Sequence, residues 1–214
     1  MKDIAVYGAG GFGCEVACLI HSINKNEPTW NFIGFFDDDS SLKGTKNAYG
    51  VVLGGKDDLN AYQKPLAIVI AIGNPQDLKK VAENIQNENI EFPNLIAPGT
   101  IILDEDSMTI GKGNIISFGC YLSHHIVIGD FNILNGFIPF GHDTVMGNYN
   151  VIMPSVNISG GVHIGDCNFL GVQSVVLQSV KIGNHVRLGA NSVMMHHAKD
   201  GALYIGNPAK KTTF

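Results

Sequence analysis

Large apolar residues recur at every sixth position through the second half of the chain. Stepping by six from Ile110 meets only Ile, Leu, Val, Met or Phe until Met194. These positions are Ile110, Ile116, Leu122, Ile128, Leu134, Phe140, Met146, Ile152, Ile158, Ile164, Leu170, Val176, Ile182, Leu188 and Met194. The residue after each is usually small, and Ile96 and Ile102 carry a weaker form of the pattern, offset by two residues. Such a six-residue repeat predicts a β-helix in which each repeat supplies one short strand and one turn.

The repeat also predicts the shape of each coil. Six residues per flat face and three faces per coil give a triangular prism with 18 residues per turn, whose periodic apolar side chains point inward. Residues 18 apart should then lie above one another at about 4.8 Å, the spacing of neighbouring strands. Hexapeptide repeats of this kind resemble the left-handed parallel β-helix, an exception to the right-handed rule for parallel crossovers.

The first 95 residues instead alternate strand and helix patterns. Short apolar runs predict strands at Ile4–Tyr7, Phe32–Phe36 and Ala67–Ile72. Helical spacing of apolar residues, or a proline near the start of the segment, predicts helices at Val16–Ile23 and Pro75–Gln86. This order predicts a small parallel sheet covered by helices. We therefore expect an α/β Rossmann-like domain over residues 1–95 and a left-handed β-helix over residues 96–214.

Composition excludes several classes of partner. The 14 basic and 19 acidic residues give a net charge of −5, which argues against nucleic acids and anionic membranes, because both need a basic surface. No apolar run approaches the ~20 residues of a membrane span. The apolar N-terminus is too short and too interrupted by glycine for a signal peptide. The four cysteines form no CxxC motif, so we expect unpaired thiols in a reducing, cytoplasmic compartment.

A glycine-rich loop separates the first predicted strand from the first predicted helix. It fits the pattern G-x-G-x-x-G and consists of Gly8, Ala9, Gly10, Gly11, Phe12 and Gly13. Free N–H groups at a helix N-terminus favour a pyrophosphate, and the carboxylates of Asp37, Asp38 and Asp39 suit ribose hydroxyls. NAD and a nucleotide sugar both carry a pyrophosphate, but a sheet of four or five strands lacks the second half of a dinucleotide fold, which favours the nucleotide sugar. For the three aspartates a solvated turn is an equally good interpretation.

One corner of the predicted prism gathers histidine, aspartate and glycine. The 18-residue spacing stacks three pairs on consecutive coils, namely His124-His125, His142-Asp143 and Gly160-Gly161. An outward imidazole beside a carboxylate is a tuned general base, and the Gly160 N–H suits a developing oxyanion. Taken alone, His142 and Asp143 also fit a surface turn with a local hydrogen bond. No metal site is expected, since the sequence has no His-x4-His pair.

Six motifs in order carry a resemblance over nearly the whole chain. They are IAVYGAGGFG, IGFFDDDSSLKG, NLIAP, GHDTVMGN, ISGGVHIGD and GNPAK. With them the sequence resembles the sugar O- and N-acetyltransferases of the sialic-acid O-acetyltransferase type, including bacterial nucleotide-4-amino-sugar N-acetyltransferases. The resemblance implies a homotrimer that binds acetyl-coenzyme A (acetyl-CoA) in the groove between neighbouring β-helices and acetylates a nucleotide sugar for surface glycan synthesis.

The resemblance also implies roles for individual residues. His142 would be the catalytic base, Asp143 its acidic partner, and the amide of Gly160 would face the thioester carbonyl. Coenzyme A would lie near Gly161, Leu177, Gln178, Ala190, Pro208 and Lys210. The N-terminal domain would hold the nucleotide sugar near Gly8, Gly10, Gly11, Phe12, Asp37 and Asp38.

The chain departs from that family at two positions. Members commonly have histidine where this loop has Phe12, and often have a second histidine, linked to cofactor contacts, where this chain has Val151. N-acetylation of a nucleotide-linked 4-amino sugar is the leading hypothesis. O-acetylation of a sialic-acid-type sugar and a non-catalytic nucleotide-sugar sensor or scaffold remain as alternatives. An NAD-linked oxidoreductase has no hydride-handling residue that we can name.

Overall fold

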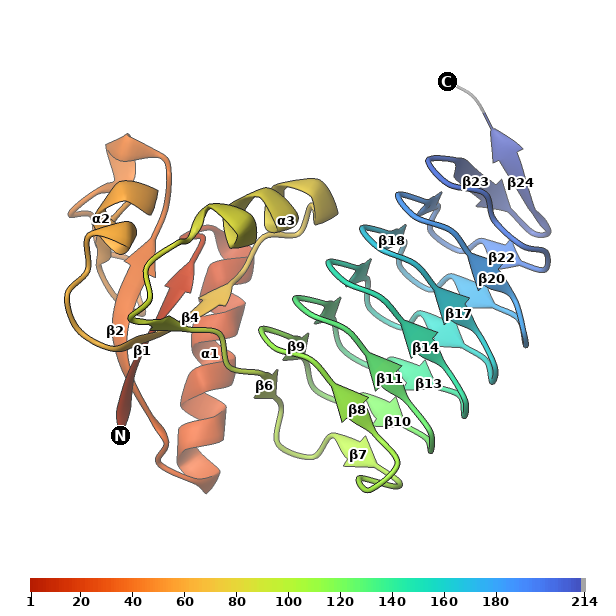
Figure 1. The fold of residues 1–214 in the computed structure, drawn as a ribbon, viewed down its shortest axis with the longest axis horizontal. Coiled ribbons are helices and arrows are strands. Elements are labelled where there is room, and N and C mark those ends of the chain that lie inside the picture. The colour runs from red at the N-terminus through yellow and green to blue at the C-terminus, as the bar shows by residue number, and fades with distance from the viewer. Residues whose placement is uncertain (213–214) are drawn as a thin grey trace.

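The computed structural model describes residues 1–212, which form an α/β domain followed by a stack of coils (Figure 1). The N-terminal sheet has five parallel strands in the order β3-β2-β1-β4-β5. These strands are β1 (Lys2–Tyr7), β2 (Trp30–Phe36), β3 (Val52–Gly54), β4 (Leu66–Ile70) and β5 (Ile90–Glu91). The helices are α1 (Gly11–Asn26), α2 (Lys56–Asn60) and α3 (Pro75–Asn84), with a 3₁₀ turn at Ser40–Leu42. The predicted α/β domain is confirmed, and the elements that the sequence did not indicate, β3, α2 and β5, are all short.

The C-terminal part is a left-handed β-helix with three parallel faces, here called A, B and C. Face A consists of β7 (Ile101–Ile102), β10 (Tyr121–Leu122), β13 (Pro139–Phe140), β16 (Asn157–Ile158), β19 (Val175–Val176) and β22 (Val193–Met194). Face B consists of β8 (Thr109–Ile110), β11 (Val127–Ile128), β14 (Val145–Met146), β17 (His163–Ile164) and β20 (Lys181–Ile182). Face C consists of β6 (Leu95–Ile96), β9 (Ile115–Ile116), β12 (Ile133–Leu134), β15 (Val151–Ile152), β18 (Phe169–Leu170), β21 (Arg187–Leu188), β23 (Leu203–Gly206) and the antiparallel β24 (Ala209–Thr212).

The strand register confirms the 18-residue coil. Tyr121 pairs with Pro139 on face A, and Leu134 pairs with Ile152 on face C. The first coil is longer, because Ile102 pairs with Leu122. This longer coil explains the two-residue offset at the start of the repeat. The inward side chains stack as predicted: every periodic residue except Ile110 is at most 3% exposed.

Each turn places one residue in the left-handed region of backbone space. The non-glycine residues with positive φ recur at every sixth position and are His125, Phe131, Phe137, Asp143, Tyr149, Ser155, Cys167, Gln173, Ser179, His185 and Asn191. Gly161 occupies the same place in its turn, with φ of 67°. Non-glycine residues adopt this conformation only when the surroundings enforce it. Here the inter-coil ladders on both sides of each turn supply that constraint.

Face C differs from the other two because its outer side is also buried. Ile115, Ile133 and Val151 point outward from the coil and are at most 1% exposed, since they join the apolar core of the N-terminal domain. The α/β domain therefore lies against the early coils on face C (Figure 1). In the sequence, the strands of face C that make this contact consist of two consecutive apolar residues, one for each side of the sheet. The predicted division at residues 95/96 falls inside β6, so we propose that the boundary lies in the segment between β5 and β6.

A ladder of buried asparagines runs along the inside of the turns between faces B and C. Asn114, Asn132, Asn150 and Asn168 are each 0% exposed and lie 18 residues apart. The Asn150 side chain donates to Asn132 Oδ1 at 3.0 Å and accepts from the Asn168 N–H at 2.9 Å. Each amide thus satisfies backbone and side-chain groups of the neighbouring coil, as buried polar groups require. No helix among residues 1–212 is both long and apolar enough to cross a membrane.

Replacing Asn150 with alanine should destabilise the β-helix by about 1–3 kcal/mol, because it leaves buried donors of Asn168 without an acceptor. Thr109→Ala is the control, since Thr109 is an exposed polar residue on face B; its cost should stay within about 0.5 kcal/mol. Urea denaturation measures both. Equal losses in the two variants would contradict a stabilising role for the ladder.

Candidate active site

The corner between faces A and B brings together the residues that the 18-residue spacing predicted to stack. His142 and Asp143 lie in the turn between β13 and β14, with His124 and His125 one coil earlier. The imidazole rings of His124 and His142 are parallel within 11°, with centroids 5.5 Å apart. This stacking confirms the predicted corner. It does not assign chemical roles to the residues.

The Asp143 carboxylate holds the ring of His142. His142 Nδ1 lies 2.7 Å from Asp143 Oδ2. Because an ionised carboxylate only accepts hydrogen bonds, this contact places the ring proton on Nδ1 and leaves the Nε2 lone pair free. Hydrogen bonds from His142, and then from His125, lower the pKa of Asp143 and keep it ionised. The pair therefore has the geometry of an oriented general base.

Gly160 lies against the free nitrogen of this imidazole. A Cβ atom added at Gly160 would come within 2.6 Å of His142 Nε2 and 2.8 Å of its Cε1. The absent side chain is therefore what allows the ring to occupy its position. Within residues 1–212, the Gly160 N–H donates no hydrogen bond, whereas the next amide, Gly161 N–H, donates to the carbonyl of His142 at 2.7 Å. Gly160 thus has a donor available beside the imidazole.

The structure adds contacts at this corner that the sequence interpretation missed. His125 Nδ1 lies 3.1 Å from Asp143 Oδ1, so the carboxylate contacts two imidazoles, one through each oxygen. The backbone N–H of His125 donates to Ser107 Oγ at 2.8 Å. Ser107, His125 and Asp143 are successive positions of the 18-residue period. The 18-residue period therefore could have indicated that these three residues lie close together.

The residues that the resemblance places near coenzyme A lie at three locations. Gly161, Leu177 and Gln178 share the corner of His142, one and two coils further along. Ala190 lies in a turn between faces C and A, which is a different corner. Pro208 and Lys210 belong to the C-terminal β23–β24 hairpin, where the peptide before Pro208 is cis. Within one chain the hairpin lies beside the Ala190 turn, since Ile205 and Ala190 line one groove and the Gly206 N–H donates to Ser192 Oγ at 2.9 Å. The His142 corner is on the other side of face A.

Ala190 borders an open groove of about 620 Å³ on the late coils. Its walls include Val172 and Ile205, which are 39% and 43% exposed, and Arg187, whose guanidinium lies 5.3 Å from the ring centroid of Phe169. The groove thus combines exposed apolar side chains with one cation. Val151, where the resemblance expects a cofactor-linked histidine, is 0% exposed beneath the N-terminal domain, so this position is not available to a ligand in this chain.

A second cleft, of about 470 Å³, lies at the carboxyl ends of the N-terminal strands. Tyr7 and Gly8 follow β1, and Asp37 and Asp38 follow β2. The strand order β3-β2-β1-β4-β5 changes direction at β1 and β4: β2 and β3 follow on one side of β1, and β4 and β5 follow on the other. Open α/β sheets bind ligands at such a switch point. Within residues 1–212 the buried hydroxyl of Tyr7 has no hydrogen-bond partner. Burial, and then the neighbouring Asp38, raise its pKa.

The aspartates of this cleft already have partners in the protein. Asp37 Oδ2 accepts from the Ala9 N–H at 2.8 Å, and its Oδ1 accepts from the Asp39 N–H at 2.9 Å. Asp38 Oδ1 accepts from the Lys56 N–H at 3.0 Å. Asp37 thus holds the backbone of the glycine loop at Ala9. Its contacts are those expected of an aspartate in a turn and do not require a ligand. Gly10 and Gly11 are different, because a Cβ at either would meet nothing within 4 Å, which leaves their backbone open to a ligand.

Phe12 lies in a groove between the two domains. The groove encloses about 350 Å³ and is walled by α1 and by the turns between faces C and A, including Phe118 and Phe137. Phe137 is 68% exposed. Phe12 therefore lies among apolar side chains at the corner between faces C and A, whereas His142 lies at the corner between faces A and B.

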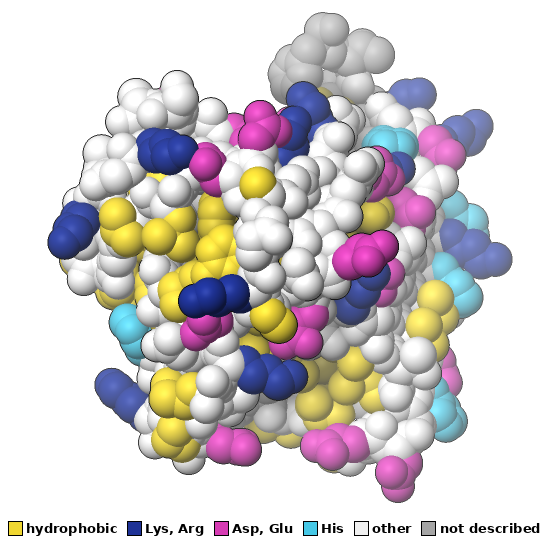
Figure 2. All heavy atoms as spheres, turned by 60° about the vertical axis from the view of Figure 1, so that its left-hand side comes forward, with side chains coloured by type: hydrophobic (Ala, Val, Ile, Leu, Met, Phe, Trp, Pro, Cys, Tyr) yellow, Lys and Arg dark blue, Asp and Glu magenta, His cyan; other side chains and the backbone are white. Residues whose placement is uncertain are grey.

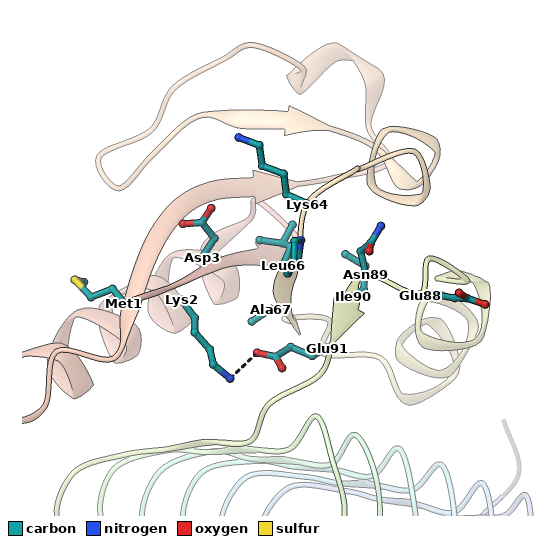
Figure 3. Close-up of a pocket in the computed structure, with 11 residues that line it drawn as sticks. Met1, Lys2, Asp3, Lys64, Leu66, Ala67, Glu88, Asn89, Ile90 and Glu91 are labelled. Atoms are coloured by element: carbon teal, nitrogen blue, oxygen red, sulfur yellow. Dashed lines mark hydrogen bonds and ion pairs between the residues drawn. The ribbon is translucent and has the colours of Figure 1, made fainter.

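Another hollow, of about 660 Å³, lies at the opposite end of the sheet from the glycine loop (Figure 3). Its side chains include Lys2 and Glu91, which form an ion pair at 3.5 Å. Apart from that pair, the charged side chains in the view do not converge on one point. On the face shown in Figure 2, basic and acidic side chains are interspersed. The side chains that the sequence indicated for catalysis lie at the His142 corner and not in this hollow.

Comparisons with known proteins match both parts of the chain. The PglD N-terminal domain family matches residues 3–85. A search of curated proteins gave no match. Among solved structures, WeeI from Acinetobacter baumannii AYE has 29% sequence identity and a TM-score of 0.88, with 99% of this chain and 100% of that chain covered.

Two further structures were solved with ligands. PerB from Caulobacter crescentus, in complex with CoA and GDP-perosamine, has 25% identity and a TM-score of 0.86, and the match covers 100% of this chain and 98% of that one. The acetyltransferase domain of PglB from Neisseria gonorrhoeae, in complex with acetyl coenzyme A, has 25% identity and a TM-score of 0.75, with 99% of each chain covered. Both domains are matched in the same order, so the chain is similar over its whole length to structures that include an acetyltransferase domain. This similarity is consistent with the nucleotide-4-amino-sugar N-acetyltransferase family that the motifs indicated.

Proposed function

We propose that this protein transfers an acetyl group from acetyl-CoA to the amino group of a nucleotide-linked 4-amino sugar. The proposal rests on the position of the His142 imidazole, which is hydrogen-bonded to Asp143 and packs against Gly160. It occurs in a fold that matches, over the whole chain, an enzyme crystallised with CoA and GDP-perosamine. The reaction would supply surface glycan synthesis, and the unpaired cysteines fit the cytoplasm, as the sequence suggested.

The corner supplies the two groups that acetyl transfer needs. The sugar amine attacks the thioester carbonyl, and His142 Nε2 takes the proton that the nitrogen loses. The carbonyl oxygen becomes an oxyanion, for which the Gly160 N–H is the donor. When the tetrahedral intermediate collapses, the carbon–sulfur bond breaks, the amide forms, and the thiolate of CoA leaves and takes up a proton. Asp143 stabilises the imidazolium that exists between these steps.

A homotrimer would complete the site. The outward residues of face A are Ile101, Tyr121, Pro139, Asn157, Val175 and Val193, and all of them except Asn157 are apolar or aromatic. Ile101 and Tyr121 are 56% and 36% exposed. A mainly apolar face of this kind suits a threefold axis, about which identical faces meet. The His142 corner borders face A on one side, and the Ala190 and Phe12 corner borders it on the other. In a trimer, the His142 corner of one subunit would therefore meet the Ala190 corner and N-terminal domain of its neighbour.

This arrangement distributes the ligands over both subunits. Gly161, Leu177 and Gln178 would contact CoA from the subunit that supplies His142, and Ala190, Pro208 and Lys210 would contact it from the neighbour. The nucleotide would occupy the cleft beside Gly8, Gly10 and Gly11, with its pyrophosphate near the N-terminus of α1. Asp38 and the unpartnered hydroxyl of Tyr7 are the polar groups there with capacity for ribose or base. Phe12 would pack against the sugar.

Replacing His142 with alanine should lower kcat by ~10²–10⁴-fold while leaving the binding of acetyl-CoA intact, because the imidazole acts on the proton and not on the cofactor. The measurement is acetyl-CoA consumption across UDP-, dTDP- and GDP-linked 4-amino sugars and free sialic acid. His163→Ala, an exposed histidine on face B, is the control. A near-normal kcat in His142→Ala would contradict the role of His142 as general base. If the unaltered protein is stabilised by a sugar nucleotide in a thermal-shift assay but not by acetyl-CoA, the sensor alternative replaces the enzyme.

Tyr121→Lys on face A should dissociate the trimer and abolish turnover, because it places a charge on the apolar face at the threefold axis. Val127→Lys is the matched control: Val127 is 39% exposed at the equivalent position of face B, which the proposed assembly leaves free. Light scattering coupled to size-exclusion chromatography gives the mass of each variant. A trimeric Tyr121→Lys protein, or equal dissociation of both variants, would rule out face A as the shared surface.

A further inference from the structure

We propose that His124, His125 and Asp143 form a binding site for a divalent transition-metal ion, with zinc as the best-matched ion. The three side chains lie at the corner between faces A and B, and one ligand atom from each lies within 4.8 Å of the other two. His142 is not one of the ligands. Asp143 contacts His125 through Oδ1 and His142 through Oδ2, so the metal site uses the carboxylate oxygen that does not hold His142.

The distances within the cluster suit tetrahedral coordination. The two Nδ1 atoms are 3.3 Å apart, and His125 Nδ1 is 3.1 Å from Asp143 Oδ1. Zinc binds imidazole nitrogen and carboxylate oxygen at about 2.0–2.2 Å, so ligand atoms at tetrahedral angles are separated by about 3.3 Å. Two of the three edges of the cluster already have this length.

Without a metal, both contacts of His125 Nδ1 must share one proton. A ring nitrogen holds either one proton or one lone pair. If His125 Nδ1 carries the proton, it can serve Asp143 Oδ1 and the lone pair of His124 Nδ1 only through one bifurcated hydrogen bond. If it instead accepts from His124, two lone pairs face each other between His125 and Asp143. A metal ion uses the three atoms more fully, because it is bound by a lone pair from each of them.

The surroundings hold the ligands in place and leave room for the ion. His124 stacks on the ring of His142, and the backbone of His125 is fixed by the hydrogen bond of its N–H to Ser107 Oγ. Asp143 is tied through its other oxygen to His142, so Oδ1 remains available. The side chains of His125 and Asp143 are 63% and 53% exposed, which leaves the fourth coordination position open to water. Two imidazoles and a carboxylate favour zinc, copper or nickel over magnesium and calcium, which prefer all-oxygen sites.

The test is a zinc titration of the full-length protein, followed by calorimetry and by NMR of the histidine ring nitrogens. We expect one zinc ion per chain and shifts of the Nδ1 signals of His124 and His125, with no such shifts when magnesium is added. His125→Asn and His124→Asn should each weaken zinc binding by at least about tenfold, since losing even an outer hydrogen-bond partner of a ligand costs that much. Both side chains project from the surface, and circular dichroism checks that the variants fold.

His196→Asn is the matched control, because His196 belongs to the other adjacent histidine pair of the chain, in which His197 Nδ1 instead accepts from the Lys181 N–H at 3.0 Å. This variant should bind zinc as the unaltered protein does. Unchanged ring signals of His124 and His125 on adding zinc would overturn the proposal, as would zinc affinities of His124→Asn and His125→Asn equal to that of His196→Asn.

Discussion

Parallel pairing between coils offset by 18 residues determines where the side chains of this protein meet. Each strand from β6 to β22 is only two residues long, and the inner strands pair with the coils before and after them. No such strand is stable by itself, so the stack holds the register. Once the register is fixed, Gly160 must lie beside His142, and His142 beside His124. A shift of one residue in any coil would turn its inward residue outward and move its turn residues away from this column. The fold and the candidate site therefore depend on the same hydrogen bonds.

The turns explain why this corner can carry reactive groups. The position occupied by Asp143 is held in the left-handed region, with φ of 56°, by the ladders on either side. That conformation lets consecutive side chains project from the corner, so that His142 and Asp143 contact each other in a geometry that a regular strand would not allow. On the following coil glycine occupies both positions, which leaves space for the imidazole and exposes an amide. The buried polar side chains of the prism are meanwhile the asparagine ladder, whose amides are paired, and a few hydroxyl residues such as Thr144, Ser174 and Ser192.

The sequence predicted the features that arise from periodicity, and it failed where contacts depend on the other domain. The apolar step of six predicted the β-helix, the coil length and the stack of His142 on Gly160, because these are local consequences of one repeat. It did not indicate that the outer side of face C would be covered, although the paired apolar residues such as Ile133 and Leu134 record that contact. Nor could it show that Asp37 supports the Ala9 amide, since that bond joins residues 28 positions apart through the N-terminal sheet. The 18-residue spacing could have predicted that His125 lies near Asp143. It could not predict which atoms face each other, because the orientation of the rings is not encoded locally in the sequence.

The separation of the two halves of the candidate site has a consequence for how activity can be controlled. His142 lies on one edge of face A, and the Phe12 groove and Ala190 lie on the other, so within one chain the prism stands between the base and the groups expected to hold the substrates. In the proposed trimer a neighbour brings the second edge to the first, so activity would require the assembly. The strength of contact through face A would then set the fraction of complete sites. The A–B corner also carries His124 and His125 beside the carboxylate that orients the base, so a cation bound there would act on His142 through Asp143 without occupying the position of either substrate.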